Sequence, residues 1–244
     1  MRLMTLLRPL LPRPAGAAHW PSQCLVCRAW PAQTLCADCR SRFAPPATRC
    51  QRCALPVPAG VAVCGACLRE PPPMAQCLAA VPWQWPWSLC IVRWKFDGDT
   101  GLSAPLAALL QATPGVTEAL ATAELVLPMP MSPQRLAERG YNPALLLARQ
   151  LAPGRVRPDL LLRTRHTPPQ RSLPRAERLR NVRGAFQVDP LAAPALRGRH
   201  VLLVDDVMTT GATLKEAAGA LLQAGASTVR VLTLARVLKA EDWL

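Results

Sequence analysis

The stretch that most constrains the fold of this chain is VLLVDDVMTTGAT, residues 201–213. Its first four residues are apolar, and a short continuous run of this kind is typical of a strand buried on both faces of a parallel sheet. After Gly211, apolar residues recur three or four positions apart to about residue 224, which predicts an amphipathic helix that ends at Gly225. A strand leading directly into a helix predicts an α/β domain.

The polar residues between this strand and this helix indicate a ligand. The turn consists of Thr209, Thr210, Gly211, Ala212 and Thr213. At a helix N-terminus, unpaired N–H groups and the helix dipole favour an anion. Asp205 and Asp206 are expected at the carboxyl edge of the strand, where open α/β sheets bind ligands, and their carboxylates need donors or a cation. A ribose 5-phosphate, with Mg²⁺ shared by the carboxylates, meets both needs. Strand, acidic pair and helix cap also occur in sheets that bind nothing.

The whole stretch resembles the 5-phosphoribosyl-1-pyrophosphate (PRPP) binding motif of the type I phosphoribosyltransferases. The resemblance implies that Asp205 and Asp206 hold the ribose hydroxyls. It also implies that residues 209–213 hold the 5-phosphate.

Eight of the ten cysteines form four C-x-x-C pairs near the start of the chain. They are Cys24, Cys27, Cys36, Cys39, Cys50, Cys53, Cys64 and Cys67. Zinc takes four thiolates in a tetrahedron, so four such pairs predict two closed, structural Zn²⁺ sites. The short spacers favour sequential pairing over a cross-braced arrangement. A disulfide framework is the alternative in a secreted chain, but the α/β pattern that follows favours zinc. Cys77 and Cys90 are expected to be buried as small apolar residues.

The formal net charge of +14 is carried by 26 Arg and only three Lys. Nine of the Arg lie in residues 155–183, against two acidic residues. Arg makes forked contacts to phosphate, so this segment predicts a polyanion or single-stranded DNA as partner, with a solvated basic face as the alternative. Residues 163–186, which include Arg165 and Arg178, are expected to form a cationic loop near the phosphate site. Arg135 and Arg139, after a strand at 125–130, are candidates for pyrophosphate contacts or ordinary surface residues.

The coarse secondary-structure pattern predicts a doubly wound parallel sheet with helices on both faces, preceded by a small zinc module. Further strands are expected at residues 89–94 and 227–237, and helices at 102–111 and 145–151. The predicted organisation is a lead at 1–20, a double zinc ribbon at 21–70 and the α/β domain at 77–240. Trp83, Trp85 and Trp87 are expected in the core or an interdomain seam rather than as base-stacking residues.

The sequence also bears on membranes and export. No apolar run approaches the ~20 residues needed to span a bilayer. Residues 1–20 are leucine-rich, but Arg and Pro interrupt them, so we expect a lead segment of a cytoplasmic protein rather than a signal peptide.

Taken together, these motifs resemble the ComF family of phosphoribosyltransferase-like proteins. The resemblance rests on the cysteine pairs, Lys95-Phe96 with the Gly98 turn, RLAERGYN at 135–142, TPPQ at 167–170, NVRGAF at 181–186 and the PRPP-like motif. It implies a cytoplasmic protein linked to natural transformation and the inward handling of single-stranded DNA. Type I transferases grip pyrophosphate with a tight, small-residue turn after an early strand, whereas this chain has LPMPM at 127–131.

Three functional hypotheses follow. The first is a ComF-type protein that binds PRPP or a nucleotide and, with DNA-uptake proteins, supports DNA uptake. The second is an active phosphoribosyltransferase for a base or amine acceptor, whose catalytic residues the sequence does not identify. The third is a PRPP-sensing regulator or adaptor that binds a protein partner through the zinc module.

Overall fold

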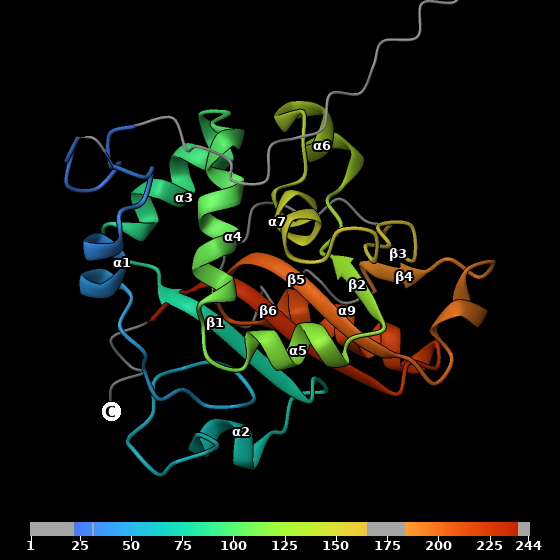
Figure 1. Cartoon of the computed structure of the whole chain (residues 1–244). Helices are drawn as coiled ribbons and strands as arrows, with labels where there is room; N and C mark the ends of the chain where they lie inside the picture. Colours follow the sequence, from blue (N-terminus) through green and yellow to red (C-terminus); the bar gives the residue numbers. More distant parts are fainter. Residues whose placement is uncertain (1–21, 31, 165–183, 239–244) are drawn as a thin grey trace, which may run out of the picture.

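The structure is a computed structural model and describes residues 22–30, 32–164 and 184–238 (Figure 1). Its strands are β1 (Gln76–Pro82), β2 (Leu125–Pro128), β3 (Leu161–Arg163), β4 (Phe186–Val188), β5 (His200–Met208) and β6 (Thr228–Arg236). Its helices are α1 (Ala37–Phe43), α2 (Gly65–Arg69), α3 (Trp87–Phe96), α4 (Ser103–Gln111), α5 (Val116–Thr122), α6 (Pro133–Arg139), α7 (Pro143–Leu151) and α9 (Ala212–Gln223), with short 3₁₀ turns at Thr100–Leu102 and Ala193–Leu196.

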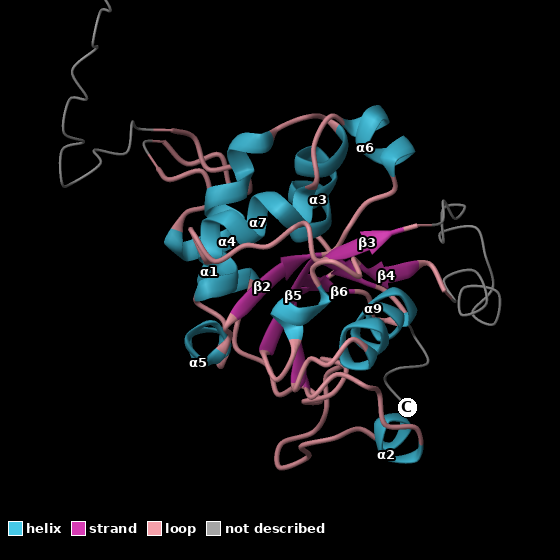
Figure 2. Ribbon diagram, turned by 90° about the vertical axis from the view of Figure 1, so that its right-hand side faces the viewer, coloured by secondary structure: helices cyan, strands magenta, loops and turns pink. Residues whose placement is uncertain are grey.

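A four-stranded sheet in the order β1-β6-β5-β2 forms the centre of the molecule, and all its pairs are parallel. Helices α4 and α7 pack on one face, and α9 packs on the other (Figures 1 and 2). The predicted fold class is therefore confirmed. Strand β5 is longer than the predicted four residues, so Asp205 and Asp206 are the sixth and seventh of its nine residues rather than lying after its end.

The prediction of a strand at residues 89–94 is wrong, because this segment lies within helix α3. Its buried residues are Trp87, Cys90, Ile91 and Trp94, spaced three or four apart as on one helix face. A short apolar run does not by itself distinguish a strand from a buried helix. The edge strand is instead β1, whose residues alternate between partly buried and buried positions.

The cysteine-rich segment lies along the edge strand β1 and packs against both faces of the sheet. Its second half, with Cys50 and Cys53, shares a hydrophobic core with α9. Its first half contributes Leu35 to the core beneath α3, α4 and α7. The backbone N–H of Cys77 in β1 donates to the Gln51 carbonyl at 2.7 Å, which covers part of the sheet edge.

Two tryptophans lie at this seam. Trp87 is fully buried, and its indole N–H donates to the Phe43 carbonyl of α1 at 2.6 Å. Trp85 is 59% exposed and meets the Phe43 ring edge-on. Trp87 therefore has the predicted role at the seam. A cavity of about 480 Å³, lined by parts of α1, β1 and the end of α4, lies at the same seam, and the predicted ribose-phosphate residues do not line it.

Strands β3 and β4 form a separate antiparallel pair beside α9 (Figure 2). The segment predicted as a cationic loop lies between these two strands in the sequence. Arg165 and Arg178 lie outside the described residues. Among the helices of the described part of the chain, none combines the length and apolar character needed to cross a bilayer.

Candidate functional site: an acidic pair, a helix N-terminus and two cysteine clusters

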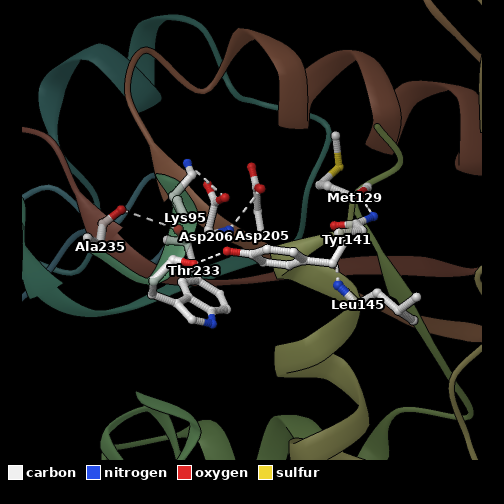
Figure 3. Close-up of polar contacts among 10 residues, drawn as sticks. Lys95, Met129, Tyr141, Leu145, Asp205, Asp206, Thr233 and Ala235 are labelled. Atoms are coloured by element: carbon white, nitrogen blue, oxygen red, sulfur yellow. Dashed lines mark hydrogen bonds and ion pairs between the residues drawn. The ribbon is translucent and has the colours of Figure 1, made fainter. Parts of the chain in front are cut away.

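Strand β5, an interior strand, carries the acidic pair toward the carboxyl end of the sheet, beside the last turn of α3. The side chain of Asp206 forms an ion pair with Lys95 at 2.8 Å, and both side chains are less than 15% exposed. Lys95 belongs to the last turn of α3, where the Tyr141 hydroxyl donates to the Trp94 carbonyl and the Trp94 indole donates to Ser103. Figure 3 shows Lys95, both carboxylates and Tyr141 gathered at this end of the sheet. These contacts hold the ammonium beside the pair.

The electrostatic environment of Asp205 is unusual. Burial, and then the charge of the adjacent Asp206 carboxylate, raise its pKa to about 7, whereas the Asp206 backbone N–H and the charges of Lys95 and Arg163 lower it. Burial, and then the charge of Arg135, lowers the pKa of Arg163. A carboxyl group that gains its charge near neutral pH is suited to binding hydroxyl groups or a cation that compensates that charge.

Asp205 is expected to make the stability of the ligand-free protein depend on pH. Because its folded pKa lies above the ordinary value of 3.8, the folded state holds a proton that the unfolded chain releases. The free energy of unfolding should therefore fall as pH rises from about 4 to about 7. Urea unfolding between pH 4 and 8 should show this slope in the parent and lose it in Asp205→Asn.

Asp159→Asn is the matched control, because a hydrogen bond from Arg157 lowers the pKa of this exposed carboxyl. It should keep the parental slope between pH 5 and 7. Equal slopes for Asp205→Asn and the parent would contradict the predicted titration of Asp205.

The turn after β5 ends at a glycine from which helix α9 begins. Gly211 caps α9 with a φ of 76°, a left-handed conformation that disfavours residues with a Cβ. A Cβ added at Gly211 would lie 2.4 Å from the Met208 side chain. The Ala212 N–H is 3.4 Å from the Thr210 hydroxyl, and the main chain then enters the 12-residue helix. The helix N-terminus therefore follows the acidic pair within one continuous segment.

The two arginines predicted to contact pyrophosphate, Arg135 and Arg139, lie on α6, the helix that follows β2. Ser132 caps this helix by accepting from the Arg135 N–H, and burial lowers the Arg135 pKa, with Arg139 adding to the effect. Arg139 lies over the Phe96 ring at 4.9 Å from its centroid. The structure therefore places Arg135 near Arg163 and Arg139 beside the residue that follows Lys95.

The place expected to bind pyrophosphate has few free backbone donors. The Met129 N–H donates to the Val204 carbonyl at 2.8 Å, and the Met129 carbonyl accepts from the Asn142 amide at 3.0 Å. Pro128 and Pro130 have no N–H to offer. The segment is therefore occupied in holding β2 to β5 and to α7.

The sequence reasoning missed two charged residues at this end of the sheet, Lys95 and Arg163, as site residues. Lys95 is one of only three lysines in an arginine-rich chain, which is a weak signal for a specific role. Arg163 lies at the end of β3, a three-residue strand with no clear sequence pattern.

The eight paired cysteines form two clusters, Cys24, Cys27, Cys36 and Cys39, and Cys50, Cys53, Cys64 and Cys67. The sulfur atoms of each cluster lie within 4.8 Å of one another. All of these cysteines are free thiols rather than disulfides, and the grouping is the predicted sequential one.

The geometry of each cluster fits a tetrahedral zinc ion. The Sγ atoms of Cys27 and Cys36 are 3.7 Å apart, as are those of Cys53 and Cys64. Zn–S bonds of about 2.3 Å imply S–S separations of about 3.8 Å. The residues after the second and sixth of these cysteines, Arg28 and Ala54, have positive φ angles, so the two knuckles share one backbone shape. The two clusters therefore support structural Zn²⁺.

Comparisons with known proteins agree with this geometry. A family model described as phosphoribosyl transferase domain matches residues 136–243, and one described as double zinc ribbon domain matches residues 17–68. The chain is 33% identical to the DNA utilization protein YhgH of Escherichia coli O157:H7 over 89% of this chain and 98% of that protein. It is 34% identical to Competence protein F of Haemophilus influenzae over 71% of this chain and 78% of that protein. Competence protein ComFC of Streptococcus pneumoniae is 33% identical over 59% of this chain and 60% of that protein.

Proposed function

The chain belongs to the ComF family of phosphoribosyltransferase-like proteins, and from this premise we propose that it binds PRPP or a related ribose 5-phosphate and supports DNA uptake. The observation that carries the proposal is the continuous unit of β5, turn and α9. It presents Asp205 and Asp206 and then the Gly211 turn at a helix N-terminus. Carboxylates that accept hydroxyl donors and N–H groups that donate to phosphate are the two recognition elements a ribose 5-phosphate needs.

The surrounding cations support this assignment. Lys95 forms an ion pair with Asp206, and the charge of Arg163 lowers the pKa of Asp205, so cationic side chains of the protein partly compensate the charge of the acidic pair. We propose that ribose hydroxyls and Mg²⁺ take over this compensation when the ligand binds. The carboxylate oxygens are suitable hard ligands for Mg²⁺, and the ion would supply positive charge beside the ribose. In this proposal Thr209, Thr210 and Thr213 contribute hydroxyl or N–H donors to the phosphate.

The segment LPMPM supports a binding role over efficient transfer. A transferase must bind the pyrophosphate that leaves. The Met129 N–H already donates to the Val204 carbonyl, and the flanking prolines have no N–H to donate. We therefore propose that ribose 5-phosphate recognition is stronger than pyrophosphate recognition. In this proposal Arg135 and Arg139 are the residues left to contact a pyrophosphate or a nucleic acid phosphate.

We also propose that the protein acts in the cytoplasm with single-stranded DNA and DNA-uptake proteins as partners. The proposal is supported by relatives named for DNA utilization and competence, and by the net charge of +14. Reduced cysteine clusters are also typical of intracellular zinc proteins. The predicted domain boundaries, 21–70 and 77–240, remain part of this proposal.

Calorimetric titration of the zinc-loaded protein in the presence of Mg²⁺ tests the function. PRPP and ribose 5-phosphate should both bind, with affinities within about tenfold of each other, and pyrophosphate alone should bind more weakly. Failure of both ribose phosphates to bind would refute the ligand assignment. Release of pyrophosphate from PRPP with a base or amine acceptor would instead establish the transferase alternative.

A further inference from the structure

One buried cation outside the acidic site connects two parts of the molecule. Arg236, the last residue of β6, is only 5% exposed. Its Nε donates to the Cys53 carbonyl at 2.9 Å. Its Nη1 donates to the carbonyls of Met208 at 3.3 Å and Val237 at 2.6 Å, and also to the Thr209 carbonyl. Among the ion pairs of the described residues, none involves Arg236.

These carbonyls belong to two functional segments. Cys53 is a thiol of the second cysteine cluster, whereas Met208 is the last residue of β5 and Thr209 is the first residue of the predicted phosphate turn. A planar guanidinium fixes the relative positions of the groups it bonds, because its donors lie in one rigid fork. A buried guanidinium is also costly to desolvate unless its donors are bonded, so these contacts strongly constrain both segments.

We propose that Arg236 is a positioning residue that fixes the phosphate turn against the second zinc site. This inference rests on the proposed function, because it makes the affinity of the turn for a 5-phosphate depend on an intact second cluster. The residue does not touch the ligand. It acts through the main chain of Met208 and Thr209, whose carbonyls it holds so that the following N–H groups keep their direction.

The charge balance of the region supports this role. Four thiolates on one Zn²⁺ leave a net charge of about −2 at the second cluster. A 5-phosphate bound at the turn would add a second anion near Met208 and Thr209, the residues that Arg236 contacts on the side away from Cys53. Arg236 lies between the two, and the nearby Arg49, whose pKa is lowered by burial and then by Arg236, donates to the Ala54 carbonyl at 3.1 Å. The guanidinium therefore separates two anionic groups that would otherwise repel each other.

The first cysteine cluster provides an internal contrast. Its module contacts the rest of the protein through α1, where the Trp87 indole donates to the Phe43 carbonyl, and through the core beneath α3 and α4. That core lies on the opposite face of the sheet from α9. Among the hydrogen bonds of the described residues, none joins the first cluster to the phosphate turn. We therefore expect only the second zinc site to be coupled to phosphate binding.

The test compares Arg236→Met and Arg236→Lys with Arg230→Met. Arg230 lies on the same strand, and its Nη1 donates to the Thr122 hydroxyl at 2.7 Å, far along β6 from the turn. Titration with PRPP and Mg²⁺ should show about tenfold or greater loss of affinity in Arg236→Met, since hydrogen bonds to charged groups are strong. Arg236→Lys keeps the charge but loses the fork, so its affinity should be intermediate. Arg230→Met should bind as the parent does.

A second readout uses the reciprocity of coupled binding. Zinc release to a coloured chelator should be biphasic in the parent, with one of the two ions released more slowly when PRPP is present. Arg236→Met should lose this protection. The coupling would be overturned if the parent binds PRPP and Arg236→Met binds it with the same affinity. It would also be overturned if PRPP slows the release of both zinc ions equally.

The same experiment separates the two proposals. If the parent binds neither PRPP nor ribose 5-phosphate, the proposed function and the inference built on it both fail. If the parent binds and the Arg236 variants bind equally well, only the inference fails. Should Arg236→Met melt below the assay temperature, Arg236→Lys and the zinc-release pattern of the parent still decide the outcome.

Discussion

Removal of zinc is expected to unfold the cysteine-rich segment and to destabilise the sheet behind it. Structural zinc contributes about 10–16 kcal/mol to the folding of zinc-finger peptides, which is comparable to the whole stability of a typical domain, about 5–15 kcal/mol. Both hydrophobic cores include residues of this segment, such as Cys53 on one face and Leu35 on the other. The loss should therefore spread beyond the ribbon itself.

Thermal melts with and without a strong chelator measure this effect. We expect the transition midpoint to fall by more than about 10 °C after chelation, since each 1 kcal/mol shifts the midpoint of a domain of this size by about 2–4 °C. Trp87, buried at the seam with α1, should become exposed and shift its fluorescence to longer wavelength.

A thiol reductant without chelator is the control that separates zinc from disulfides. The cysteines are free thiols in the structure, so reduction alone should leave the melt unchanged. Unfolding by the reductant alone would indicate a disulfide framework, and full zinc loss with an unchanged melt would show that the metal does not hold the fold.

The parts of this protein that were predictable from sequence are those whose chemistry is local. The stretch 201–213 combines a strand, an acidic pair and a helix start within thirteen residues, and β5 and α9 occupy these positions. The C-x-x-C pairs are equally local, because each knuckle supplies two ligands and the short spacers bring consecutive pairs together.

The parts that were missed depend on contacts between distant residues. Residues 89–94 are apolar in a way that fits a strand or a buried helix, and only packing against α4 and the sheet decides between them. Lys95 becomes a site residue because Tyr141, 47 positions away from Trp94, holds the end of α3 beside β5. Arg236 and Cys53 are separated by 183 positions, and their local sequences give no signal that the Arg236 side chain donates to the Cys53 carbonyl.

The double substitution Asp205→Asn/Asp206→Asn is expected to remove ribose-phosphate binding while keeping the fold. Asparagine has the same size as aspartate but carries no charge, so each position should lose about 1.5–3 kcal/mol of hydrogen bonding to ribose hydroxyls or Mg²⁺. Two such losses correspond to at least about 100-fold weaker binding of PRPP. At neutral pH the substitution removes the burial cost and the repulsion that raise the Asp205 pKa, but it also removes the Lys95–Asp206 ion pair, so a thermal melt of the variant should accompany the titration.

The matched control is Asp97→Asn/Asp99→Asn, a second acidic pair two residues apart in the turn after α3. Asp99 accepts from Arg93 at 3.2 Å and is about one-third exposed, so this variant changes the charge by the same amount without touching β5. Its PRPP titration should match the parent. Equal loss of affinity in both double variants would mean that overall charge, rather than the acidic pair of β5, governs binding. Because Asp205 and Asp206 adjoin Lys95 and precede the Gly211 turn, we expect the loss in the β5 variant alone.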